Sequence, residues 1–126
     1  DYGRRKMGAA IGQQRGGIPR PLPVLKMKDK APDWHTVDCI VEEWNPEFIV
    51  FGLPTNLDGS SNKIVKEIQN LGQIFSARYL AQVHYIDERL SSKMASQRMK
   101  AGQKFSVDSI AAGLILETWF EGQNKW

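Results

Sequence analysis

The sequence predicts an α/β fold in which a five-stranded mixed sheet carries helices on both faces. In the first third of the chain, extended and proline-rich segments precede any helical pattern, which predicts three antiparallel strands. Further on, two short apolar runs are each followed by a helical pattern, which predicts two parallel strands with right-handed crossovers. A chain of 126 residues, 41% of them hydrophobic, is expected to form one domain over residues 1–126.

The N-terminal segment has an acid, a basic turn and then an apolar run, which predicts a hairpin with residues 7–12 as its far arm. The small residues Gly8, Ala9 and Ala10 indicate that another backbone or a ligand approaches this arm closely. Residues 22–27 are expected to form the third strand, whose prolines suit a sheet edge. The first 30 residues hold eight basic and two acidic side chains, so an anionic partner such as nucleic acid is expected.

The middle of the chain has clear boundaries. A helix is predicted to start at 31–33, with Asp33 as its N-cap, and to stop at Asn45 and Pro46. The apolar run 48–51 predicts a strand buried on both faces and therefore central in the sheet.

The rest of the chain predicts a strand and three helices. The strand covers 82–86, and helices are expected over 64–79, 92–102 and 106–122. The last helix is apolar most of the way round, so it should be largely buried.

Composition excludes several classes of protein. The single cysteine, Cys39, rules out a disulfide framework and is expected to be a small core residue in a cytoplasmic protein. No apolar run approaches the roughly 20 residues that span a bilayer, and no signal peptide is visible. The glycine-rich loops that bind nucleotide phosphates are also missing.

Carboxylates at element boundaries are the candidate functional groups. Glu88 follows the strand 82–86, Asp108 opens the buried last helix, and Asp1 precedes the hairpin. Three carboxylates without a His or Cys cluster would favour Mg²⁺ or Mn²⁺, and such a site suits phosphodiester hydrolysis. The alternatives are local, because Asp108 could simply cap its helix and Glu88 could pair with Arg89 or Lys93. Asp1 could be a disordered terminal residue. Asp87 is interpreted as structural.

Four ordered motifs carry a family resemblance. They are Asp1 to Gly12 (DYGRRKMGAAIG), Gly52 to Gly59 (GLPTNLDG), Asp87 to Ser92 (DERLSS) and Val107 to Ala112 (VDSIAA). Together they resemble the YqgF family, also called RuvX-like, a branch of the RNase H-like nucleases, and the similarity runs the whole length of the chain. The resemblance implies an RNase H-like fold and three acids, Asp1, Glu88 and Asp108, that hold one or two Mg²⁺ or Mn²⁺ ions.

The resemblance also implies a departure at the N-terminus. In the family the acid matching Asp1 lies within an apolar first strand, and the upstream half of that strand is not in this sequence, so the first strand is expected to be truncated. Arg4, Lys6 and Arg89 are candidate phosphate contacts, because basic side chains position nucleic-acid backbones. Asn56 and Asp58 lie in a loop that could border the site.

Three functions follow from these expectations. The first is a metal-dependent nuclease that processes the 5′ end of pre-16S rRNA, a structured RNA, as the resemblance implies. The second is a Holliday junction resolvase that acts on branched, four-way DNA, which rests on analogy of fold. The third is a non-catalytic nucleic-acid-binding protein. A monomer or homodimer with no membrane partner is expected in each case.

Overall fold

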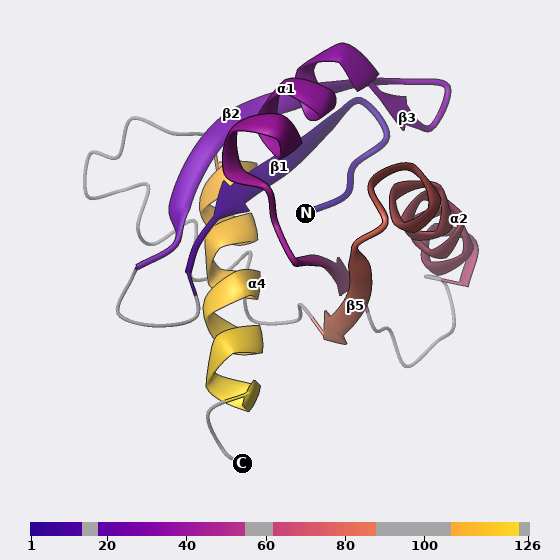
Figure 1. Ribbon diagram of the computed structural model, residues 1–126. Helices are drawn as coiled ribbons and strands as arrows, with labels where there is room; N and C mark the ends of the chain where they lie inside the picture. Colours follow the sequence, from indigo (N-terminus) through magenta and orange to yellow (C-terminus); the bar gives the residue numbers. More distant parts are fainter. Residues whose placement is uncertain (14–17, 55–61, 88–106, 124–126) are drawn as a thin grey trace.

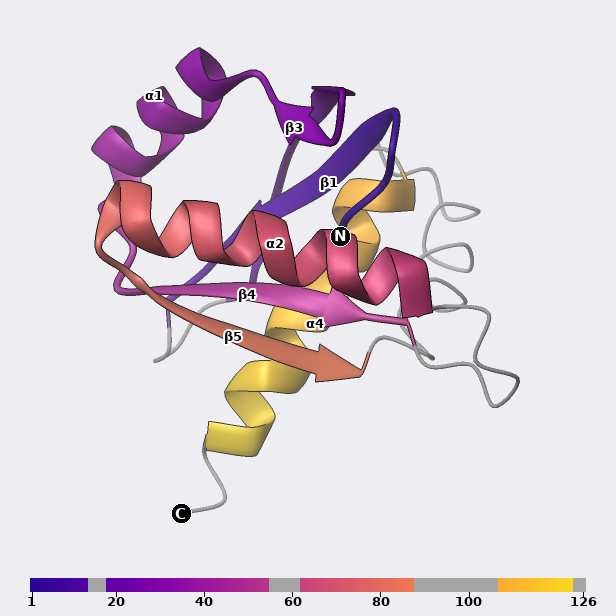
Figure 2. The ribbon, with the colours of Figure 1, turned by 90° about the vertical axis from the view of Figure 1, so that its right-hand side faces the viewer.

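The computed structural model describes residues 1–13, 18–54, 62–87 and 107–123, and it confirms the mixed α/β class (Figure 1). Its elements are β1 (Lys6–Ile11), β2 (Arg20–Lys28), β3 (Ala31–Pro32), α1 (Trp34–Trp44), β4 (Phe48–Leu53), α2 (Asn62–Tyr79), β5 (Gln82–Asp87) and α4 (Val107–Gln123). Helices α2 and α4 lie on opposite sides of β4 and β5, as both views show (Figures 1 and 2). The helix predicted over 92–102 lies outside the described residues.

The strands are split between two sheets. β1 pairs antiparallel with β2, from Lys6 opposite Lys26 to Ile11 opposite Arg20, and β2 pairs with β3. β4 and β5 pair in parallel over their whole length. No ladder joins β1 to β4 within the described residues, so these residues form a sheet of three strands and a sheet of two in place of the single five-stranded sheet that the sequence predicted.

The early strands differ in detail from the prediction. The third strand of the first sheet is Ala31–Pro32, where the sequence predicted the start of a helix. The helix begins instead at Trp34, and the predicted cap is confirmed, because Asp33 accepts a hydrogen bond from the His35 backbone N–H at 3.1 Å. Asn45, in the left-handed region with φ of 45°, ends α1 as expected.

The main core lies between the two sheets and the helices α1 and α2. It combines buried side chains from β1, β2 and β4 with Ile68 and Leu71 of α2, which are almost fully buried. A second cluster, Ile110, Ala111 and Leu114, lies on α4 and confirms that this helix is largely buried. Ile110 and Leu114 each contribute roughly 1.5–3 kcal/mol when buried, so α4 is fixed firmly against the strands.

Two burial predictions were wrong. In β4 only Phe51 and Gly52 are buried, and Phe48, Ile49 and Val50 are half-buried, because the β4 edge that faces β1 has no strand partner in the described part of the chain. Cys39 is exposed rather than in the core, since it lies on the outer side of α1, with its Sγ 3.9 Å from His35 Nε2. None of the described helices is both long enough and apolar enough to cross a membrane.

Candidate active site

Gly8 of β1 is the point where two of the predicted site residues meet. The Asp1 amino group donates to the Gly8 carbonyl and the Gly8 N–H donates to the Asp1 carbonyl, both at 2.9 Å. On the other side of Gly8 runs the first turn of α4, so a Cβ at Gly8 would collide with the Asp108 carbonyl and lie 2.8 Å from the Ser109 nitrogen. The close backbone approach predicted for this stretch is thereby confirmed, and it sets Asp1 and Asp108 on either side of one glycine.

Asp108 occupies the first turn of α4, where a negative charge is stabilised by the helix dipole. Its side chain is 33% exposed, and its Oδ2 lies 3.2 Å from the ammonium of Lys6, which is 60% exposed. This single, partly solvated contact leaves the other carboxylate oxygen of Asp108 outside the ion pair with Lys6. The arrangement allows the carboxylate to accept a second cation.

Arg4 lies in a different environment from Lys6. Its guanidinium donates from Nη2 to Oε2 of Glu67 at 2.8 Å and from Nε to Oε1 at 3.2 Å, and the Tyr2 hydroxyl also donates to Oε1 at 3.0 Å. The Glu67 side chain is only 6% exposed. Hydrogen bonding from Arg4 lowers the pKa of Glu67 below its usual value, with the Tyr2 hydrogen bond acting in the same direction. The segment that follows Asp1 is therefore tied to α2.

Sequence reasoning missed Glu67. The signal was present, because Glu67 stands three residues after Ile64 and four before Leu71, within the apolar stripe of the helix. A carboxylate on a buried stripe requires a partner, but the partner lies 63 residues away in the sequence and could not be named from spacing.

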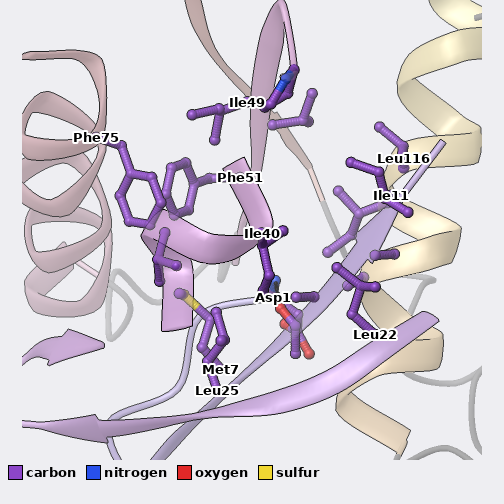
Figure 3. A pocket seen from close by; sticks show the side chains of 18 of the residues that line it. Asp1, Met7, Ile11, Leu22, Leu25, Ile40, Ile49, Phe51, Phe75 and Leu116 are labelled. Carbon is purple, nitrogen blue, oxygen red and sulfur yellow. Dashed lines mark hydrogen bonds between the residues drawn. The ribbon is translucent and has the colours of Figure 1, made fainter. Parts of the chain in front are cut away.

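A cavity of about 150 Å³ separates β1 from β4, and Asp1 stands among its lining residues (Figure 3). Most of the lining is apolar, and Figure 3 shows Phe51 and Phe75 on one side and Ile11, Leu22 and Leu116 on the other. Among the described residues that line the cavity, Asp1 is the only charged one. No ladder joins β1 to β4 in the part of the chain that the structure describes, so the cavity is the space that divides the two sheets.

The remaining predicted residues follow the ends of β4 and β5 in the sequence. Glu88, Arg89, Asn56 and Asp58 lie outside the described residues, and Asp87 is the exposed last residue of β5. Among the residues that the structure describes, no three His, Cys, Asp or Glu side chains form a group that could hold a metal. Asp1 and Asp108 supply the oxygen donors that hard divalent cations prefer, so the two described acids fit such an ion by chemistry.

The strand pairings and the helices on both sides define an RNase H-like α/β protein, with acids from two distant parts of the chain beside its first strand. The sequence model of the RuvX family, described as Holliday junction resolvase, matches residues 1–122. The chain therefore belongs to the RuvX family, as the ordered motifs indicated.

Similar proteins cover nearly the whole chain. A protein of Edwardsiella ictaluri is 39% identical over 131 residues, which are 99% of this chain and 94% of the relative. Proteins of Aeromonas hydrophila subsp. hydrophila and Pseudomonas paraeruginosa are each 39% identical, over 98% and 94% of this chain and 92% and 87% of their own lengths. All three carry the name "Putative pre-16S rRNA nuclease".

Proposed function

We propose that this chain is a metal-dependent nuclease that hydrolyses phosphodiester bonds in the 5′-end processing of pre-16S rRNA. The observation that carries the proposal is the convergence of Asp1 and Asp108 on Gly8, from parts of the chain more than 100 residues apart. Family membership supports hydrolysis of nucleic acid, and the names of the relatives favour the rRNA precursor as substrate.

Asp1, Asp108 and Glu88 would hold one or two Mg²⁺ or Mn²⁺ ions through their carboxylate oxygens. When bound, such an ion lowers the pKa of a coordinated water and stabilises the charge on the leaving oxygen. Gly8 lets the backbone of Asp1 and the first turn of α4 approach each other. Lys6 holds the Asp108 carboxylate at 3.2 Å and so keeps it at the end of α4 that faces β1.

Cleavage by acid-to-amide variants tests the site. We expect Mg²⁺- or Mn²⁺-dependent cleavage of a structured rRNA precursor, reduced at least about a hundredfold in Asp108→Asn and in Glu88→Gln, since losing a ligand should exceed the loss from outer-shell partners. The control is Asp38→Asn, which makes the same acid-to-amide change at a partly exposed acid away from the proposed site. Asp38 pairs with Arg78 at 2.7 Å between α1 and α2. Circular dichroism would verify that each variant stays folded. Full activity in both Asp108→Asn and Glu88→Gln would contradict the assignment of these acids as metal ligands.

A second candidate function is resolution of branched DNA, which the description of the matching family favours. Cleaving the rRNA precursor and a four-way DNA junction side by side, at equal protein and metal concentrations, distinguishes the two. Faster cleavage of the junction would favour the resolvase. Salt-sensitive binding without turnover of either substrate would favour a binding protein.

A further inference from the structure

Three lysines share one face of the first sheet. Lys6 of β1 stands directly opposite Lys26 of β2, and directly opposed residues of an antiparallel pair point to the same side. Lys28 is two residues further along β2, so it points to that side as well. All three side chains are exposed, and we refer to them as the lysine track.

The lysine track lies on the side of the sheet that carries α4. The Lys6 ammonium reaches Asp108 in the first turn of that helix. The alternate residues Met7, Leu25 and Met27 are buried in the core on the opposite side, against α1 and α2. The three positive charges therefore gather near the N-terminal end of α4, where the helix dipole adds further positive potential.

This arrangement is unfavourable without an anionic partner. Like charges directly opposite each other on neighbouring strands destabilise a sheet, and of the three lysines only Lys6 pairs with Asp108 in the described part of the chain. Among the described residues, neither Lys26 nor Lys28 forms an ion pair. The chain thus carries exposed positive charge directly beside a candidate metal ligand.

We propose that the lysine track binds the phosphates of the nucleic-acid backbone and guides the strand past Asp108. The inference rests on the proposed function and names the residues that would hold its substrate. Lysine suits this task because phosphate contacts position the backbone without reading its sequence. Arg4, by contrast, has its guanidinium directed to Glu67 on the side of α2.

Binding measured without divalent metal tests the track apart from cleavage. The variant is Lys26→Ala/Lys28→Ala, which leaves Lys6 and Asp108 intact, and the ligand is a fluorescent duplex DNA titrated at several salt concentrations. We expect about tenfold weaker binding at low salt and a salt slope reduced by about 1.8, or about 0.9 for each phosphate contact. Lys26→Arg/Lys28→Arg should restore both. Thermal melting would verify that these surface variants stay folded.

The matched control is Lys63→Ala/Lys66→Ala, which removes two exposed lysines of α2 on the other side of β4 and β5. It should leave the slope unchanged. Equal losses of DNA binding in the two double variants would overturn the proposal for the lysine track. The proposal would also be overturned if polyglutamate of matched charge displaced the labelled DNA as effectively as unlabelled DNA does. If the track variant binds normally while Asp108→Asn abolishes cleavage, the track fails and the nuclease stands. If the track variant binds weakly but the unmodified chain cleaves nothing, the track stands and the nuclease fails.

Discussion

Two ion pairs connect the N-terminal segment to helices on opposite sides, and they differ in almost every property. Arg4 meets Glu67 of α2 through two hydrogen bonds at a carboxylate that is nearly buried. Lys6 meets Asp108 of α4 through one contact at 3.2 Å between partly exposed groups. The first pair holds the segment after Asp1 against α2, because both carboxylate oxygens of Glu67 accept hydrogen bonds. The second leaves both charged groups partly exposed to solvent, as the proposed binding of a metal by Asp108 and of a phosphate by Lys6 requires.

The largest stability effect should come from the cavity that separates the sheets. The hydrogen bonds between Asp1 and Gly8 have the pattern of an antiparallel pair, so residues placed ahead of Asp1 would run along the open edge of β1 toward Ile11. Fusing a six-residue apolar, β-branched segment ahead of Asp1 should raise the free energy of unfolding by about 3–4 kcal/mol, at about 24 cal/mol per Å³ of the filled 150 Å³.

Urea denaturation measures this gain, with a Gly/Ser segment of equal length as the control. The result also sharpens the comparison of the two ion pairs. If an added strand fixes Asp1 through the sheet, breaking the Arg4 pair should matter less in the fused chain. Equal stability of the two fusions would mean that the cavity does not accept a strand.

The next largest effect concerns the contact between Gly8 of β1 and the first turn of α4. Gly8→Ala puts a methyl group into the Asp108 backbone, and neither neighbour is a side chain that can rotate away. We expect a loss of about 1–3 kcal/mol from overpacking, together with weaker metal binding as Asp108 is displaced. Gly113→Ala is the matched control, because its Cβ would lie 3.9 Å from Ala10 and Pro19. Relief of a glycine inside a helix should make the control neutral or stabilising.

Local chemistry explains what the sequence could predict. The ends of α1 follow from Asp33 and Asn45, and β4 and β5 follow from uninterrupted apolar runs. The small residues about Gly8 correctly indicated a close backbone approach.

The features that sequence reasoning missed depend on partners distant in the chain. Glu67 is explained only by Arg4 and Tyr2, more than 60 residues earlier. The two residues of β3 are a strand only because β2 lies beside them, and Cys39 is exposed because α1 turns that side outward. The opposition of Lys6 and Lys26 depends on register, which periodicity alone does not specify.

Breaking the Arg4 pair should have a moderate and pH-dependent effect. Arg4→Ala leaves a nearly buried carboxylate with the Tyr2 hydroxyl as its remaining donor, and we expect a measurable loss of stability at neutral pH. Because Arg4 lowers the pKa of Glu67 in the folded chain, its contribution is fully present above the ordinary value of 4.5 and is lost as the pH falls through the lowered pKa.

Urea denaturation at pH 7 and at pH 3 measures the difference between Arg4→Ala and the unmodified chain, which should shrink at the lower pH. Arg5→Ala, which removes the exposed neighbouring arginine, is the control and should show little change at either pH. A penalty for Arg4→Ala that stays constant with pH would mean that the ionised form of Glu67 is not what Arg4 stabilises.

The smallest stability effect belongs to the Lys6 pair. Lys6→Gln should lower the free energy of unfolding by less than about 1 kcal/mol, the usual range for exposed ion pairs. Its effect should vanish in 1 M salt, where screening acts within about 3 Å, while the penalty for Arg4→Ala persists at its nearly buried partner.

Mg²⁺ binding to Lys6→Gln, measured by calorimetry, should nevertheless tighten, because the ammonium that competes for Asp108 is gone. The control is Lys63→Gln on α2. Unchanged Mg²⁺ binding in Lys6→Gln, with full stability retained, would show that the ion does not use the Asp108 carboxylate, and the contrast between the two ion pairs would then be one of exposure alone.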